Sequence, residues 1–486
     1  MTANEDWAGD PKNASTDGEF VRDATYINDR ITADVSETTP QDDGTVHWPV
    51  EADRYRLMAA SACPWAHRSV ITRRLLGLED VISLGLAGPT HDVRSWVFDL
   101  VPDGVDPVTG LRRLQEAYFN RFPDYPRGIT VPAVVEVESK KVVTNDYPSI
   151  VRDFQTEWTQ FHRAGAPDLY PVEHREEIDE IARRIYTEVN NGVYRCGFAS
   201  TQDAYDDAYV RFWKTMDWLE ERLTNRRYLV GEHITFADIF LFVTLVRHDA
   251  VYYSHFKTSR NKISEMPALW GYLRELFQIP GFGDTTDFRE IKEHYFIVHK
   301  EVNPTQIVPQ GPDLAGLASP HGREALGGQP FADGVTLPGP VPEGEHVKNP
   351  EPFQVELSGL TAGSCCAAAS TESVSFSSSS DSRRQRCQCR GTSMMRSSSV
   401  TRSPRRRWMS ACRSDMSPHP SPRSVARANA SDDGISDIRG RCCFSPSLSS
   451  RSAACRASPG PKRRVGMRDQ SGPGYCAARS GVATAR

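Results

Sequence analysis

The pattern of apolar and polar residues changes from strand-like to helix-like and back within the first hundred residues. Residues 54–60 (RYRLMAA) alternate as a strand does, and residues 81–86 (VISLGL) indicate a second strand. Between them, Pro64 suits the first position of a helix and Gly77 suits its far end. We therefore predict a helix from Pro64 to about Leu76 that connects two parallel strands by a right-handed crossover.

A hairpin and one more helix follow a long irregular stretch. Residues 88–126 are rich in Pro, Gly and Asp, which is typical of a functional or disordered loop. AVVEV at 133–137 and KVV at 141–143 predict the hairpin, and Pro148 begins a helix that runs to about Glu157. The order βαβ followed by ββα is that of the thioredoxin-like α/β fold, which we therefore expect.

Helical periodicity dominates from about residue 173. Apolar residues recur three and four positions apart in five segments, 173–189, 203–225, 235–248, 264–278 and 284–296. Thr235 and Asp238 form a capping box at the start of one of them. We predict an all-α second domain, over which NPTQIVPQGP at 303–312 returns as an extended arm.

Charge and cysteine content divide the chain near residue 360. Residues 1–360 hold 36 basic and 56 acidic side chains, whereas residues 361–486 hold 22 and 7, together with nine of the 11 cysteines. Because this Ser- and Arg-rich tail has few large apolar residues, it cannot bury enough surface to offset chain entropy. Arg405, Arg406 and Arg407 could contact nucleic acid. The abrupt excess of arginine over lysine instead favours read-through or out-of-frame coding, so we expect no nucleic-acid partner.

The patterns together predict four parts. They are an N-terminal strap (1–50), a thioredoxin-like domain (51–165), an all-helical domain with its returning arm (170–312), and a Pro/Gly-rich and then Ser/Arg/Cys-rich tail (313–486), which we expect to be disordered.

No apolar run approaches the ~20 residues that cross a bilayer, and the acidic N-terminus does not resemble a secretory signal. Two separated cysteines before residue 361 indicate no disulfide scaffold. We expect a cytoplasmic protein.

Cys63 is the strongest candidate for reactive chemistry. It takes the N-cap position of the helix opened by Pro64, where free amide N–H groups and the positive helix end favour a thiolate. His67 and Arg68 add positive charge nearby. Because the fourth position is Ala66 rather than a second cysteine, a mixed disulfide on Cys63 would persist until an external thiol resolved it. The alternative, an inert buried cysteine, fits this placement less well.

A second mark of the same fold lies at Thr130-Val131-Pro132, just before a predicted strand. In thioredoxin-like folds, a cis-proline here faces the active cysteine and offers a backbone edge to a cofactor peptide. Only about 5–6% of X–Pro bonds are cis, so the sequence alone favours an ordinary trans-proline. The predicted fold order favours cis.

The tail cysteines lack paired C-x-x-C spacing, and we predict no metal site.

Several motifs, taken together, are highly specific. In chain order, they are CPWAHR (63–68), NNGVY (190–194), GFA (197–199), RYLVG (227–231), Asp238, HY (294–295), NPT (303–305) and IVP (307–309). This set resembles the glutathionyl-hydroquinone reductases, the Xi-class relatives of the omega glutathione transferases. The resemblance covers about residues 40–312.

The resemblance implies a thioredoxin-like domain followed by a glutathione-transferase helical domain, commonly as a homodimer. It also implies reductive removal of glutathione from glutathionyl-hydroquinones. Cys63 would attack the glutathione sulfur and release the hydroquinone, and a second thiol would then free the enzyme. Tyr194 and Tyr295 match tyrosines near the quinol, where a phenol O–H can bind or protonate the leaving group. A packing role is the alternative for each tyrosine.

The resemblance also suggests how the thiol is bound, with one departure. Trp96 and Arg127 fall near the thiol-binding Trp and Arg of the family, and Val131 and Pro132 supply the backbone edge. Where the family has Asn-Glu-Ser, this chain has Asn145-Asp146-Tyr147. Asp146 keeps an acid for an ammonium group, but Tyr147 is bulkier than serine. Glutathione is the expected cosubstrate, and another small thiol, such as a sugar-linked cysteine, remains an alternative.

Two other functions fit the same fold. One is a transferase that conjugates a thiol to electrophiles or reduces dehydroascorbate. The other is a non-catalytic binding module. Conjugating members usually activate the thiol with Tyr or Ser, so Cys63 argues against the first, and the intact CPWA motif argues against the second.

Overall fold

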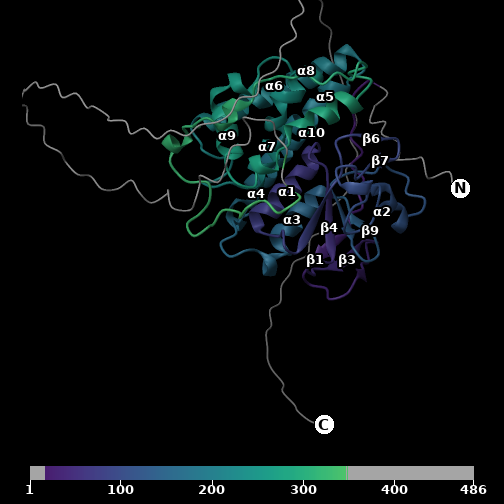
Figure 1. Cartoon of the computed structure of the whole chain (residues 1–486). Helices are drawn as coiled ribbons and strands as arrows, with labels where there is room; N and C mark the ends of the chain where they lie inside the picture. Colours follow the sequence, from purple (N-terminus) through teal and green to yellow (C-terminus); the bar gives the residue numbers. More distant parts are fainter. Residues whose placement is uncertain (1–16, 346, 348–486) are drawn as a thin grey trace, which may run out of the picture. The chain divides into compact units, whose positions relative to one another are not determined.

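A four-stranded sheet in the order β5-β4-β8-β9 forms the first domain of the computed structural model, which describes residues 17–345 and 347 (Figure 1). Its strands are β4 (Tyr55–Ala59), β5 (Ile82–Leu86), β8 (Ala133–Glu136) and β9 (Lys141–Thr144). Strand β5 runs parallel to β4, whereas β8 is antiparallel to both β4 and β9. The predicted parallel pair and hairpin are confirmed, and with them the thioredoxin-like fold.

Helix α1 (Pro64–Leu76) connects β4 to β5. Cys63 is its N-cap, Pro64 opens it, and Gly77 ends it in the left-handed conformation with φ of 73°, which glycine adopts readily because it has no Cβ. The helix packs against α3 (Tyr147–Thr156) on one side and against the helical domain on another, so every residue of α1 is buried. The predicted bounds of this helix are confirmed.

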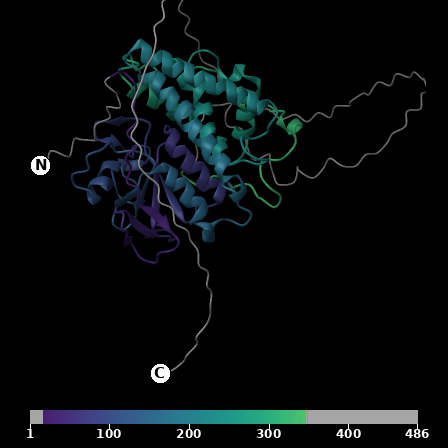
Figure 2. The same ribbon diagram turned by 180° about the vertical axis from the view of Figure 1, so that it is seen from behind.

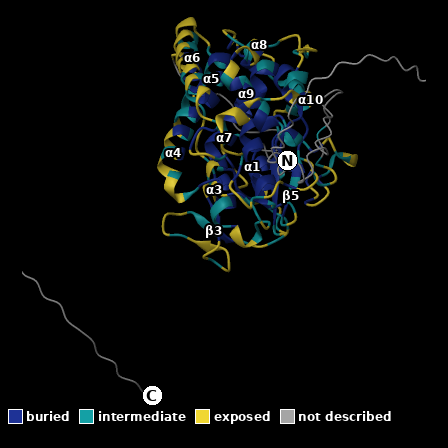
Figure 3. Cartoon of the chain, turned by 90° about the vertical axis from the view of Figure 1, so that its left-hand side faces the viewer, coloured by how far each residue is buried: buried dark blue, intermediate teal, exposed yellow. Residues whose placement is uncertain are grey.

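Helices alone make up the second domain of the described chain (Figure 2). They are α4 (Arg175–Arg184), α5 (Asn191–Phe198), α6 (Gln202–Thr224), α7 (Phe236–Arg247), α8 (Tyr253–His255), α9 (Pro267–Phe277) and α10 (Phe288–Glu293). The five predicted segments correspond to α4, α6, α7, α9 and α10, and the predicted capping box opens α7. Figure 3 shows α1 and α7 buried at the centre, while α4 and α6 carry exposed residues. Among the described residues, no helix has the length and apolar character to cross a bilayer.

Helix α5 is not predicted by periodicity, because two glycines weaken its helical propensity. Tertiary packing explains one of them. A Cβ on Gly197 would lie 2.1 Å from the ring of Phe256, so this position must be glycine for the two helical segments to pack. Gly197 opens the GFA motif, which thus lies where the chain needs close helix packing.

Short strands also occur where the sequence predicts an irregular strap. Residues 17–50 contain a small sheet in the order β1-β3-β2, formed by β1 (Arg30–Thr32), β2 (Thr39–Pro40) and β3 (Val46–Pro49). The carboxylate of Asp29 accepts hydrogen bonds from the Val46 N–H at 3.0 Å and from the Trp48 indole N–H at 3.1 Å. These strands depend on such long-range contacts and have no strong local pattern.

The stretch 88–126, also predicted to be irregular, is partly ordered in the same way. It contains β6 (His91–Asp92), β7 (Ser95–Trp96) and α2 (Leu114–Arg121). The Asp106 carboxylate organises the loop before α2, because it accepts hydrogen bonds from the backbone and hydroxyl of Thr109 and pairs with buried Arg56.

Residues 313–345 correct the prediction that disorder begins at 313. Leu317 and Phe331 are buried, and the guanidinium of Arg323 donates to the backbone carbonyls of Leu223, in the last turn of α6, and of Arg227, just beyond that helix. The segment has little regular structure, so no period reveals it in the sequence, yet tertiary contacts satisfy its polar groups. The tail from 361, with Arg405–Arg407, lies outside the described residues.

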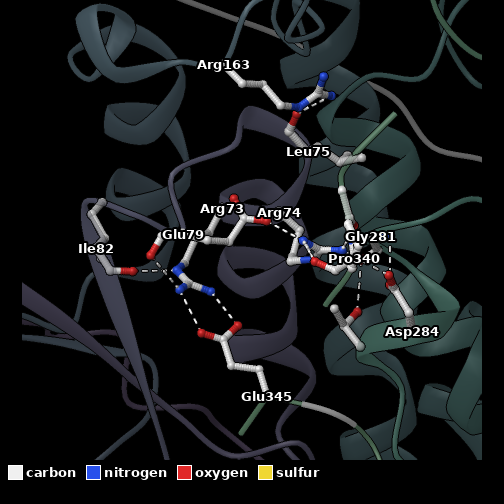
Figure 4. A network of polar contacts seen from close by, with 12 residues as sticks. Arg73, Arg74, Leu75, Glu79, Ile82, Arg163, Gly281, Asp284, Pro340 and Glu345 are labelled. Atoms are coloured by element: carbon white, nitrogen blue, oxygen red, sulfur yellow. Dashed lines mark hydrogen bonds and ion pairs between the residues drawn. The ribbon is translucent and has the colours of Figure 1, made fainter. Parts of the chain in front are cut away.

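The end of this segment contacts α1, where it binds the buried side chains of two arginines (Figure 4). Glu345 accepts two hydrogen bonds of 2.8 Å from Arg73, whose side chain is 1% exposed. The neighbouring Arg74 donates to the Gly339 carbonyl at 2.8 Å and pairs with Asp284. Removing such a carboxylate would leave a buried cation unpaired, so this segment is an integral part of the fold.

Candidate active site

Cys63 lies in a cavity of about 240 Å³ between the two domains. The residue is only 9% exposed, and its thiol donates a hydrogen bond to the backbone carbonyl of Val131 at 3.4 Å. The Val131–Pro132 bond is cis, as the fold order predicts. The cavity is lined by residues from the N-terminal segment and from both domains: Arg22, Asp23, Tyr26, Cys63, Trp65, His91, Trp96, Ile129, Thr130, Val131, Asn145, Tyr147 and Tyr194.

The charge state of Cys63 differs from the sequence-based expectation. Burial raises the pKa of the Cys63 thiol, and it outweighs the backbone N–H groups of Ala66 and Trp65 and the charges of Arg247 and Arg22, which lower that pKa. The helix end acts in the predicted direction, but the prediction omitted the loss of hydration. The thiol is therefore protonated in the free protein at neutral pH, and the nearby groups stabilise the thiolate once it forms.

Of the two cations predicted beside Cys63, His67 differs from expectation and Arg68 does not. Burial, followed by the charge of Arg247, lowers the pKa of His67 well below its usual value, so this imidazole is neutral. Burial lowers the pKa of Arg68 to about 10, which leaves it charged at neutral pH. Arg68 donates to the Asn190 side-chain oxygen at 2.6 Å and thereby joins α1 to the NNGVY motif.

Arg247, in the last turn of α7, holds the loop that precedes Cys63. Its guanidinium donates to the backbone carbonyls of Ser61 at 2.8 Å and Ala62 at 3.2 Å, and it lies 3.1 Å from Nδ1 of His67. The side chain is fully buried. Sequence reasoning missed it, because an arginine in the last turn of a helix is common and complements the helix dipole.

Three tyrosine hydroxyls form a chain beside the cavity. The Tyr194 and Tyr295 hydroxyls are 2.7 Å apart, and those of Tyr295 and Tyr252 are 2.8 Å apart. Burial raises the pKa of all three phenols, so they are protonated at neutral pH. Tyr194 lines the cavity and Tyr295 lies behind it. Tyr252 lies in an apolar segment without a recognisable motif, so the sequence does not single it out.

The predicted thiol-binding residues separate into two groups. Trp96, Val131 and Tyr147 line the cavity with Cys63, and the Tyr147 ring is 5.0 Å from that of Trp65. Three others do not line it. Arg127 forms an exposed ion pair of 2.6 Å with Asp23, Asp146 accepts a hydrogen bond from Ser149 at 2.7 Å, and Pro132 follows the cis bond.

Four histidines cluster next to Trp96, of which His255 and His294 are buried and His91 and His299 are half-buried. Nε2 of His255 and Nδ1 of His299 are 3.2 Å apart, the His294 ring stacks on Trp96 at 5.2 Å, and His91 lies 4.9 Å from the same indole. Burial lowers the pKa of His255 to about 4 and that of His294 to about 3. Burial also lowers the pKa of His91 and of His299.

These histidines should make stability fall in mild acid. Unfolded histidine titrates near pH 6.5, so below that pH the unfolded chain binds protons that the folded protein excludes. Each such histidine lowers the free energy of unfolding by about 1.4 kcal/mol per pH unit, down to its folded pKa. Urea unfolding at pH 7.5, 6.5 and 5.5 measures this effect. A constant midpoint would contradict it, and His255→Gln should reduce the slope.

Comparison with known proteins agrees with this geometry. Family models for the glutathione S-transferase N-terminal and C-terminal domains match residues 62–157 and 202–275. The chain is 40% identical over 312 residues to the Escherichia coli protein named glutathionyl-hydroquinone reductase YqjG, covering 64% of this chain and 94% of that protein.

Solved structures give the same relationship. The glutathione-bound structure of YqjG is 39% identical, with 62% of this chain and 98% of that chain covered and a TM-score of 0.57. A glutathione transferase from Gordonia bronchialis is 63% identical, with 67% and 98% covered and a TM-score of 0.64. The Xi-class transferase of Natrialba magadii is 38% identical, with 64% and 97% covered and a TM-score of 0.58. An identity of 40% over nearly the whole of a relative shows that this chain is an enzyme of the glutathione transferase superfamily and belongs to its glutathionyl-hydroquinone reductase, or Xi-class, family.

Proposed function

We propose that this enzyme removes glutathione from glutathionyl-hydroquinones through a mixed disulfide on Cys63. The observation that carries the proposal is the placement of a single thiol, the Val131 backbone and the Tyr194 phenol around one cavity of about 240 Å³. Position 66 is alanine, so no second cysteine stands in the C-x-x-C frame to resolve the disulfide. The E. coli relative YqjG is named for this activity, and its structure has been solved with glutathione bound.

The chemistry proceeds in two exchanges. The Cys63 thiolate attacks the glutathione sulfur of the conjugate, and an S–S bond forms as the C–S bond breaks. The electron pair of the C–S bond reduces the ring carbon, which takes one proton, so hydroquinone leaves. A second glutathione thiolate then attacks the sulfur of the bound glutathione, which releases glutathione disulfide and regenerates the Cys63 thiolate.

The phenols supply the proton and hold the quinol. Because burial keeps them protonated, the Tyr194 O–H is able to donate into the cavity, and Tyr295 and Tyr252 behind it orient that hydroxyl and can replace its proton. We assign Tyr194 to contact with the quinol. We assign Tyr295, which lies behind it, to positioning Tyr194.

The thioredoxin-like domain binds the thiol cosubstrate. Val131 offers its backbone to the cysteinyl part of this cosubstrate, and Trp96 packs beside it. Tyr147, the first residue of α3, lines the cavity next to Asp146, the N-cap of that helix. Arg127, which pairs with Asp23 through Nη1, is assigned to a carboxylate of the thiol cosubstrate. Asp146 is the acid nearest this helix start and is assigned to the ammonium group.

Mass spectrometry of the enzyme mixed with a glutathionyl-hydroquinone, without added thiol, tests the proposal. We expect one glutathione adduct on the peptide that contains Cys63, released when glutathione is added. An unmodified Cys63 with hydroquinone still formed would reject the mixed disulfide. Turnover with glutathione, compared with turnover with a sugar-linked cysteine, then identifies the thiol.

A further inference from the structure

The N-terminal segment brings a cation into the cavity from outside both domains. At one end, the Gly18 carbonyl accepts a hydrogen bond from the Ser200 N–H at 3.0 Å, and Phe20 stacks on the Phe198 ring at 5.6 Å. At the other end, the Ile27 N–H donates to the Asn145 side chain at 2.7 Å. Arg22 lies between these two anchors, so its backbone is tied to the helical domain and to the thioredoxin-like domain.

The guanidinium of Arg22 is held by aromatic faces and one hydrogen bond. Its carbon lies 4.6 Å from the ring centroids of both Trp65 and Tyr194, and its Nε donates to the Asn191 side-chain oxygen at 2.7 Å. These contacts position the group through cation–π attraction and a neutral acceptor. None of them neutralises its charge.

One guanidinium nitrogen of Arg22 has N–H groups that no acceptor binds. Nη2 of Arg22 is buried and makes no hydrogen bond, and within the described chain Arg22 forms no ion pair. The acid nearest in sequence, Asp23, is paired with Arg127. A buried, unpaired N–H of a cation is costly unless an anion or a strong acceptor binds it. Arg22 lines the same cavity as Cys63 and Tyr194, so a ligand bound in that cavity can supply the acceptor.

We propose that Arg22 is a catalytic residue that stabilises the Cys63 thiolate and binds a hydroquinone oxygen of the conjugate through Nη2. In the first exchange, negative charge starts on the Cys63 sulfur and passes to the quinol before a proton neutralises it. A fixed cation in the cavity that the sulfur and Tyr194 share favours the charge at both positions without having to reorganise. Arg22 is also among the groups that lower the thiol pKa, although burial has the larger and opposite effect. The second role rests on the proposed function.

Two variants of the full chain separate charge from packing. Arg22→Gln removes the cation, and Arg22→Lys keeps a cation but loses the guanidinium fork. With a glutathionyl-hydroquinone, we expect Arg22→Gln to lower kcat about 10- to 100-fold, as for loss of a charge-assisted hydrogen bond. The pH profile of Cys63 alkylation by iodoacetamide should move to higher pH in Arg22→Gln and stay near that of the unchanged protein in Arg22→Lys. Val21→Gln, on the exposed side of the same segment, should match the unchanged protein in both measurements.

The alkylation profile distinguishes the possible failures. If kcat falls in Arg22→Gln while the profile is unchanged, Arg22 only secures the segment and the proposal is overturned. It is also overturned if neither measurement changes. If the unchanged protein shows no turnover of the conjugate, the proposed function fails, yet the alkylation profile still decides whether Arg22 acts on the thiolate.

Discussion

Replacing Cys63 by serine should abolish the release of hydroquinone from a glutathionyl-hydroquinone, with a loss of at least about a thousandfold in kcat/KM. A serine hydroxyl is not ionised at neutral pH and cannot form the S–S bond that takes the place of the broken C–S bond when the C–S electron pair leaves with the ring carbon. The residual rate should equal that of free thiol acting on the conjugate in solution. Hydroquinone formation followed by chromatography measures the loss.

Cys196 provides the matched control within the described chain. This residue of α5 is 1% exposed, and burial raises the pKa of its thiol to about 12, so it is unreactive at neutral pH. Cys196→Ser should therefore keep turnover within about twofold, because it only exchanges one small buried side chain for another. An equal loss of activity in the two variants would remove Cys63 from the mechanism.

Replacing Arg247 by methionine should impair both the fold and the thiol. The methionine fills a similar volume but leaves the Ser61 and Ala62 carbonyls without their donors. Loss of hydrogen bonds to two backbone acceptors, one buried (Ala62) and one half-buried (Ser61), should lower the free energy of unfolding by roughly 3 kcal/mol. The loss of a buried positive charge should also raise the thiol pKa further, which slows alkylation of Cys63 at pH 7.5 by about tenfold.

Two further variants show whether the charge or the packing of Arg247 matters. Arg247→Lys retains the charge, so alkylation should stay near the original rate even if some stability is lost. Arg211→Met removes an exposed arginine of α6 that pairs with Glu188, and it should change neither quantity measurably. Rapid alkylation in Arg247→Met, at the rate of the original protein, would contradict the electrostatic role.

Predictions from sequence succeeded where the signal is local. Pro64 and Gly77 determine the ends of α1, because proline fits the first turn and glycine accepts the left-handed φ after the last. The capping box of Thr235 and Asp238 likewise marks the start of α7. Strand alternation and helical spacing then give the order of elements, from which the thioredoxin-like fold and the place of Cys63 follow.

The predictions that differ from the structure involve long-range contacts. The small sheet of residues 30–49 and the packing of residues 313–345 depend on single buried groups such as Asp29 and Arg323, which have no periodic pattern around them. In the site, the family motifs supplied Tyr194 and Tyr295. Nothing local singled out Tyr252, which joins them through one hydroxyl.

The sequence by itself determined the nucleophile, the absence of a second cysteine in its motif and the helix that presents it, since each depends on residues adjacent in the chain. Only the tertiary structure decided the protonation of that sulfur, because the loss of hydration comes from side chains far away in sequence. It also brought Arg22 and Arg247, 225 positions apart, to the same thiol. Coulomb attraction and burial depend on distance in space, and no spacing along the chain encodes them.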